Sequence, residues 1–342
     1  DVAFTIALAA AVSADAAYSG IAASDVTGAN VDDDSAGFVV SPSSGLVTSE
    51  SGGETTFSVE LSTQPSANVE IPLSLTDSSE AMINKTSLVF SAADWSTAKV
   101  VTVTGVDDDV DDGNQAFTVE LGAAQSLDAT YSDEDPTDVT GLNVDDDTAG
   151  ITVSGSSGLS TSESETTAAF SVVLDSEPTH TVSIDIVSAD TGELGVVSPG
   201  SGTLVFEPSN WSASQQVTLI GVDDEISDGT QSVSLNLGPA ASSDANYSGV
   251  TLSSLSVNNT DDDPLPEVDI VASASITEGN STGGSLSLGV TLDRESTSTI
   301  TVDYATANGS ATAGNDYTTA NGTLTFLAGE TSKNITVDVL GD

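Results

Sequence analysis

The stretch VTVTGVDD at residues 101–108 returns as VTLIGVDD at residues 217–224. Both copies alternate apolar and polar residues and end in glycine and two aspartates, which predicts a half-buried strand followed by a turn. Other segments recur at 113 to 116 residues: FSVEL at 57–61 and FSVVL at 170–174, LVF at 88–90 and 204–206, and VDDD at 31–34 and 144–147 with TDDD at 260–263. This period indicates tandem copies of one β unit.

Two whole units emerge, 35–147 and 148–263, each with about seven alternating segments bounded by turn residues, as is typical of a two-sheet sandwich. Residues 1–34 match only the last third of a unit, and residues 264–342 match only the first two thirds. We therefore expect an all-β chain of tandem immunoglobulin-like β-sandwiches in an elongated string. Residues 1–34 would be the C-terminal part of a preceding sandwich and residues 264–342 the N-terminal part of a following one.

The two partial units also suggest how the chain relates to its neighbours. The segment from Val2 to Val12 lies in register with AFTVEL at 116–121, so we interpret it as a strand and not a signal peptide. We expect the native chain to continue in both directions. The alternative is that copies complete one another head to tail by strand donation.

Composition excludes several classes of function. The 342 residues include 53 Asp and Glu against 4 Lys and Arg, for a formal charge of −49, so nucleic acid and anionic membrane surfaces are not expected partners. No apolar run approaches the roughly 18 residues of a membrane span, so no direct membrane insertion is expected. The chain has no cysteine, so an extracellular protein of this kind needs a source of stability other than disulfide bonds. A bound metal is the obvious substitute.

The aspartate triplets point to the identity of that metal. Three adjacent carboxylates repel one another, and no fold gains from crowding them unless a cation lies among them. Solvation of the surface alone predicts evenly spread acids, yet 25 of the 53 acids fall in the clusters at the repeat junctions and their counterparts. Zinc lacks ligands here, with one histidine and no cysteine, and magnesium keeps its waters. The pattern favours calcium.

The last unit carries a family resemblance. ITEGN at 276–280, VDYATANGSATAGNDY at 302–317 and GTLTFLAGETSKNITVDVLGD at 322–342 resemble the Calx-beta domain, a calcium-binding sandwich found in sodium/calcium exchangers and in large bacterial surface proteins. The two complete units are similar more loosely, since they keep the LVF strand, the GVDD turn and the closing DDD but lack the DY motif.

The resemblance implies a set of calcium ligands at one end of each sandwich. In the first complete unit these are Glu50, Glu80, Asp107, Asp108, Val110 through its carbonyl, Asp112, Asp145, Asp146 and Asp147. In the second they are Glu163, Glu193, Asp223, Asp224, Ile226 through its carbonyl, Asp228, Asp261, Asp262 and Asp263. The last unit offers Glu278, Asp316 and Asp342, and the preceding unit is closed by Asp32, Asp33 and Asp34. Gln115 stands where the family often has a second acidic turn residue, which lowers the charge of that site.

Other conspicuous residues are assigned structural roles. His180 has no catalytic partners in the pattern. Trp95 and Trp211 recur before a strand and are expected to pack on the core rather than to bind sugar. Tyr131 and Tyr247, in DATYS and DANYS, are expected to be corner residues that anchor a loop.

These observations favour a structural and adhesive role for the chain. We expect a stalk or spacer segment of a giant secreted or cell-surface protein, whose partners are adjacent repeats of the same chain and further copies in a filament or bundle. The first alternative is a calcium-sensing regulatory module, and a more distant one is an accessory region of a carbohydrate-active enzyme. The chain has no nucleophile motif, no phosphate loop and a single histidine, so we do not expect it to be an enzyme.

Overall fold

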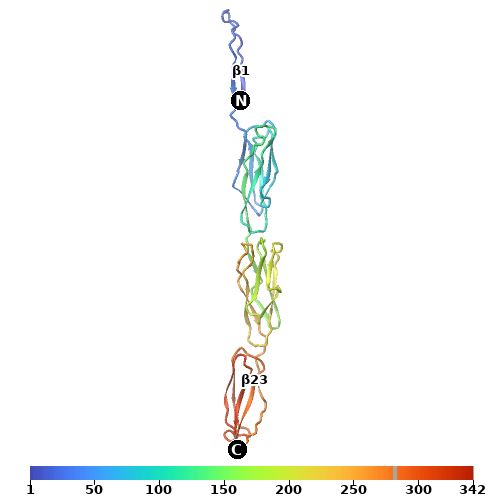
Figure 1. The fold of residues 1–342 in the computed structure, drawn as a ribbon, viewed down its shortest axis with the longest axis vertical. Helices are drawn as coiled ribbons and strands as arrows, with labels where there is room; N and C mark the ends of the chain where they lie inside the picture. The colour runs from blue at the N-terminus through green and yellow to red at the C-terminus, as the bar shows by residue number, and fades with distance from the viewer. Residues whose placement is uncertain (280–282, 342) are drawn as a thin grey trace. The chain divides into compact units, whose positions relative to one another are not determined.

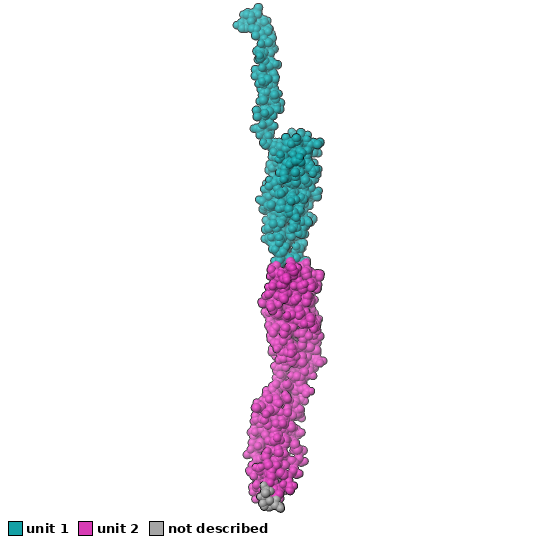
Figure 2. All heavy atoms as spheres, in the orientation of Figure 1, with its two compact units in different colours: residues 1–146 teal, residues 147–342 magenta. Residues whose placement is uncertain are grey.

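The computed structural model describes residues 1–279 and 283–341 (Figure 1). All regular secondary structure in these residues is β-strand, which confirms the predicted all-β fold of tandem sandwiches. No helix in the described ranges is long and apolar enough to span a membrane. The chain separates into two compact units, residues 1–146 and 147–342 (Figure 2).

The first unit begins with an antiparallel hairpin of two strands, β1 (Val2–Ile6) and β2 (Val26–Asn30). The predicted strand at the start of the chain therefore ends at Ile6, earlier than the apolar run that extends to Val12. The hairpin register pairs Phe4 with Gly28, just as Phe117 pairs with Gly141 later in the unit. The hairpin thus has the register of the β10–β12 pair, and the assignment of residues 1–34 to a preceding sandwich stays a prediction.

The first complete sandwich has two facing sheets. One sheet has the order β3-β5-β9-β7, with strands β3 (Phe38–Ser41), β5 (Glu54–Leu61), β7 (Ala81–Ile83) and β9 (Lys99–Gly105). The other has the order β11-β6-β10-β12-β4, with β8 also paired to β6; its strands are β4 (Leu46–Ser49), β6 (Val69–Leu75), β8 (Ser87–Phe90), β10 (Gln115–Leu121), β11 (Gln125–Ser126) and β12 (Val139–Val144). The pair β4–β12 is parallel.

The second sandwich repeats this topology. One sheet has the order β13-β15-β19-β17, with strands β13 (Ile151–Ser154), β15 (Thr167–Leu174), β17 (Leu194–Ser198) and β19 (Gln215–Gly221). The other has the order β14-β21-β20-β16-β18, with strands β14 (Leu159–Ser162), β16 (Val182–Ser188), β18 (Thr203–Phe206), β20 (Gln231–Leu237) and β21 (Leu255–Thr260). The pair β14–β21 is again parallel.

The last part of the chain forms a three-stranded and a two-stranded sheet. The first has the order β22-β23-β26 and the second pairs β24 with β25; the strands are β22 (Val268–Ile270), β23 (Gly284–Leu292), β24 (Ile300–Ala305), β25 (Asn321–Phe326) and β26 (Ser332–Val339). Their apolar faces enclose a smaller core around Phe326.

Alternation along the strands builds each core. In β5 the side chains of Phe57, Val59 and Leu61 are buried, while the residues between them are only partly covered. Trp95 and Trp211 pack against the two large cores, which confirms their predicted role.

The two corner tyrosines are buried as predicted. The Tyr131 hydroxyl donates to the Thr63 carbonyl at 2.8 Å, and the Tyr247 hydroxyl donates to the Ser176 carbonyl at 2.7 Å. Each hydrogen bond ties the loop that carries the tyrosine to the end of a strand in the opposite sheet.

Candidate metal centre

The parallel strand pair at one edge of each sandwich brings acidic segments together. In the first sandwich Val144 lies opposite Ser49, so β4 and β12 end side by side. The Glu50 amide donates to the Val144 carbonyl at 3.0 Å, which extends the pairing by one residue. Glu50 and the aspartates that follow β12 are therefore neighbours, although about 95 residues separate them in the sequence.

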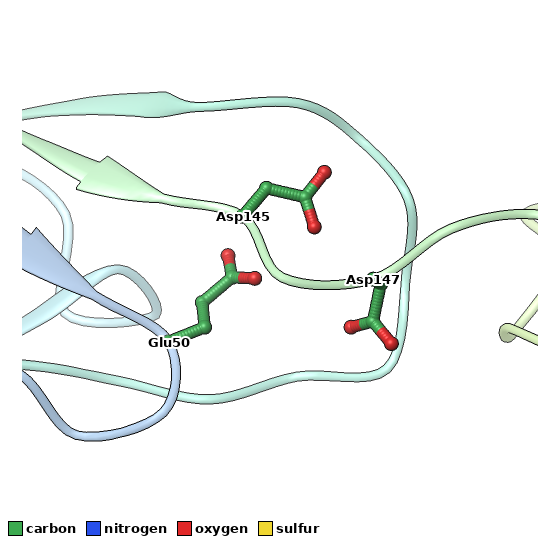
Figure 3. A group of neighbouring side chains, drawn as sticks. All are labelled: Glu50, Asp145 and Asp147. Carbon is green, nitrogen blue, oxygen red and sulfur yellow. The ribbon is translucent and has the colours of Figure 1, made fainter.

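A first group of carboxylates forms at this edge. Glu50, Asp145 and Asp147 each offer an oxygen, and these oxygens lie within 4.8 Å of one another (Figure 3). Figure 3 shows Glu50 just beyond β4 and the two aspartates on the segment that leaves β12. Asp146 contributes its backbone amide, which donates to Glu50 Oε2 at 3.3 Å.

A second group lies at the same end of the sandwich. Glu80, which precedes β7, comes together with Asp108 and Asp112 from the loop after β9, again with the oxygens within 4.8 Å. Glu80 is buried, whereas both aspartates are exposed. Glu80 is therefore the buried carboxylate of this group, although the sequence has no DY motif beside it.

The second sandwich has the corresponding arrangement with one difference. Glu163, Asp261 and Asp263 reproduce the first group. The other group joins Glu163 with Glu193 and Asp228, so that Glu163 belongs to both.

Burial alters the acidity of the two early glutamates. The pKa of Glu50 is raised from 4.5 to about 7, chiefly by burial; repulsion from nearby aspartates, Asp145 foremost, also raises it, and the hydrogen bond from the Asp146 amide lowers it. Burial likewise raises the pKa of Glu163 to about 7. Glu80 and Glu193 are also buried, and their pKa values are raised for the same reason. Each centre therefore holds buried glutamates whose ionised forms are disfavoured by burial and by the neighbouring carboxylates.

The structure places the other predicted ligands outside these groups. Within the described residues, Asp107, Asp223, Asp224 and Asp262 belong to no group of three acids, and neither do Asp32, Asp33 and Asp34. The amides of Val110 and Ile226 close turns by donating to Asp108 Oδ1 at 2.8 Å and Asp224 Oδ1 at 2.7 Å.

The predicted acids of the last unit are only partly described. Glu278 and Asp316 line one pocket, with a volume of about 680 Å³, together with apolar side chains of which Ile276 and Tyr317 are two. Asp342 lies outside the described residues.

Several residues at the centre were not predicted from the sequence. Asn143 and Asn259 are fully buried beside the carboxylates, two residues before the first aspartate of each DDD. Thr48 and Thr161 are buried two residues before Glu50 and Glu163. The sequence signal that could have revealed them is their recurrence at the repeat spacing, which the density of acids obscures.

The glycine of each GVDD motif has a steric role at the centre. A Cβ on Gly105 would lie 2.2 Å from the Ser49 carbonyl oxygen and 2.5 Å from Asn143 Oδ1. The corresponding distances from Gly221 are 2.1 Å to the Ser162 carbonyl oxygen and 2.4 Å to Asn259 Oδ1. Glycine therefore lets strands of the two sheets approach closely where the acids gather.

The donor set suits a hard cation. The groups that meet here are carboxylates, and carboxylate oxygens are ligands of calcium. In the described part of the chain, Asp228 Oδ1 and Asp263 Oδ2 are buried without a hydrogen-bond partner. The other oxygen of Asp263 accepts a hydrogen bond from Arg294 Nη1 at 3.1 Å. Buried oxygens that lack a donor are what a bound cation would satisfy.

Comparison with known proteins identifies the domain type. A family model of the Calx-beta domain matches residues 32–148, 145–263 and 272–342. No curated protein matches the chain.

Three solved structures are among those that the chain partly resembles. Calcium binding domain CBD12 of CALX1.1 is 19% identical over 59% of this chain and 80% of that chain, with a TM-score of 0.28. CBD12 from CALX1.2 is 23% identical over 53% and 72%, with a TM-score of 0.23. Domains 4–9 of the surface layer protein SbsC are 15% identical over 75% and 36%, with a TM-score of 0.22. These TM-scores are too low to carry an argument, so the assignment rests on the family model.

Proposed function

This chain belongs to the Calx-beta domain family, and on that premise we propose that its complete sandwiches bind calcium at the ends of their parallel edge strands. The observation that carries the proposal is the recurrence of one carboxylate group at one place in two sandwiches. Glu50 with Asp145 and Asp147 is reproduced by Glu163 with Asp261 and Asp263. Chance exposure of acids does not reproduce a buried glutamate at both places.

Calcium fits these groups better than other common cations do. It takes 6 to 8 oxygens at roughly 2.3 to 2.6 Å in flexible geometry, and the end of each complete sandwich offers carboxylates from four separate segments. Zinc prefers sulfur and nitrogen ligands, of which the whole chain has one histidine. Calcium binding would offset the burial and the repulsion that raise the pKa values of Glu50 and Glu163.

The protein supplies the arrangement, and the ion supplies positive charge. Glu50 and Glu163 anchor the first group from the buried side, with backbone amides of the DDD segments holding their Oε2 atoms. Glu80 and Glu193 anchor the second group. Calcium at about 100 times its Kd would stabilise a folded sandwich by about 2.7 kcal/mol per ion.

We further propose that the chain is a calcium-stabilised spacer of a giant extracellular or cell-surface protein and not an enzyme. Tandem sandwiches without cysteine, with acids concentrated where one repeat passes to the next, support this role. Its partners would be adjacent repeats and further copies in a filament. A calcium-sensing module is the alternative, which the family supports but which needs a responsive partner outside these residues.

Calorimetric titration of the full chain with calcium tests the binding. We expect saturable binding at both complete sandwiches, with the ions of the first lost in Asp145→Ala with Asp147→Ala and retained in Glu70→Gln, an exposed acid on β6. Absence of binding at millimolar calcium would refute the proposal, as would equal binding by the variants.

Small-angle scattering tests the spacer role separately. Chelation should shorten the mean dimension of the chain while the sandwiches stay folded, because their apolar cores do not depend on the ion. A dimension that does not change on chelation contradicts the spacer role, because the ions would then not stiffen the chain.

A further inference from the structure

Two buried asparagines lie where the acidic segments of each sandwich converge. Asn143 on β12 and Asn259 on β21 are each almost completely buried, with exposed fractions of 0% and 1%. They occupy the same position in the repeat, two residues before the first aspartate of the DDD. A buried amide is costly unless its polar atoms are hydrogen-bonded, so their contacts reveal what they hold.

The carbonyl end of each amide is held by a threonine. Thr48 Oγ1 donates to Asn143 Oδ1 at 2.9 Å, and Thr161 Oγ1 donates to Asn259 Oδ1 at 3.0 Å. Each threonine lies on the strand that the early glutamate directly follows. Because the hydroxyl donates to the oxygen, the amide nitrogen must point to the other side.

The nitrogen end of each amide holds the other two acidic segments. Asn259 Nδ2 donates to Glu193 Oε2 at 3.1 Å and to the Val222 carbonyl at 3.3 Å. In the first sandwich Asn143 Nδ2 donates to the Val106 carbonyl at 3.0 Å, and the Asn143 side chain is also hydrogen-bonded to Glu80. Val106 and Val222 begin the loops that carry the GVDD aspartates.

One amide thus connects four segments: its own DDD strand, the threonine strand, the GVDD loop and the turn with the second buried glutamate. We propose that Asn143 and Asn259 are positioning residues, which fix the buried glutamate and the GVDD loop in the geometry that receives the cation. This inference rests on the proposed calcium function. A carboxylate in place of the Asn259 amide would repel Glu193. An apolar side chain there would leave Glu193 Oε2 and the Val222 carbonyl without the donor that Asn259 supplies.

Substitution at the second sandwich tests the proposal, with the first sandwich as an internal reference. Asn259→Leu preserves side-chain size and removes every hydrogen bond of the amide. Asn258→Leu is the matched control, because Asn258 is exposed on the same strand. Calcium titration of each full-length variant is made at a temperature where circular dichroism shows it folded.

In Asn259→Leu we expect the calcium Kd of the second sandwich to weaken roughly tenfold or more, which corresponds to about 1.4 kcal/mol. The first sandwich and Asn258→Leu should keep the parental Kd. Thr161→Val, which frees the amide to rotate, should give a smaller change of the same sign. A folded Asn259→Leu with the parental Kd at both sandwiches would overturn the proposal.

Hydrogen exchange in the presence of chelator gives a readout that needs no calcium. Asn259→Leu should accelerate exchange at 222–228 and at 190–193 while the core strands β15 and β19 keep their protection. Equal acceleration throughout the sandwich would show a role in global stability only and would overturn positioning. If the parent chain binds no calcium, the proposed function fails, whereas the exchange pattern still decides whether Asn259 holds these loops.

Discussion

Replacing Glu163 by glutamine should stabilise the calcium-free second sandwich at alkaline pH. Glu163 is 1% exposed, and burial raises its pKa from 4.5 to about 7. Ionising this side chain in the folded state therefore costs up to about 3 kcal/mol, at 1.36 kcal/mol for each tenfold change in acidity. Glutamine has no charge, and its carbonyl oxygen can still accept the hydrogen bond that the Asp262 amide donates to Glu163.

The sign of the effect follows from the two pKa values. Below pH 4.5 Glu163 is protonated in the folded and unfolded chain alike, so its charge has no cost. Between 4.5 and about 7 the unfolded chain releases the proton while the folded one retains it, and stability falls as pH rises. Above about 7 the full cost is present, so we expect a gain of about 1 to 3 kcal/mol for Glu163→Gln near pH 8 and almost none near pH 4.5.

Tryptophan fluorescence isolates the second sandwich in this experiment. Each complete sandwich has one tryptophan packed on its core, so a Trp95→Phe background leaves Trp211 as the reporter. Urea unfolding with chelator is compared at the two pH values, with Glu165→Gln, an exposed acid of the same loop, as the control. If Glu163→Gln is no more stable than the control near pH 8, the argument from burial is wrong. With calcium present the order should reverse, because the variant lacks a proposed ligand.

Three further predictions concern the same sandwich. Gly221→Ala should destabilise it by about 2 to 4 kcal/mol and weaken calcium binding, because the new Cβ would lie 2.1 Å from a carbonyl oxygen of the neighbouring edge strand; unchanged thermal unfolding would contradict this. Tyr247→Phe should cost about 1 to 3 kcal/mol in urea unfolding by removing a buried hydroxyl that ties a loop to Ser176, whereas Tyr18→Phe, at an exposed tyrosine between β1 and β2, should cost nothing. Phe170→Ala should cost about 3 to 5 kcal/mol by opening a cavity in the core, and calorimetry should show the first sandwich melting as before.

Much of the fold was predictable because the strand period is local. Apolar alternation in FSVEL and FSVVL marks which side chains face a core, and the repeat spacing marks where each sandwich recurs. The roles of Trp95 and Tyr131 followed from the same recurrence and agree with their packing in the structure.

The sequence also indicated the chemistry of the candidate site, but not which acidic residues come together in it. Three adjacent aspartates and a GVDD turn indicate a cation wherever they lie, because crowded carboxylates repel. Which acids meet depends on strands that pair across about 95 residues, and only the parallel register of β4 with β12 places Glu50 beside Asp145. In the same way, the loop geometry after β9 brings Asp108 and not Asp107 to Glu80.

The neutral residues of the centre were decided by tertiary structure alone. Asn143 has no charge and no motif that singles it out in a Ser-, Thr- and Gly-rich sequence, and the GVDD motif marks Gly105 without indicating which groups it faces. Their roles arise because the two sheets approach so closely at this end that one amide meets a threonine, a carbonyl and a buried carboxyl, with no room for a Cβ beside it. Such convergence is a property of packing in three dimensions, which the one-dimensional spacing of residues does not record.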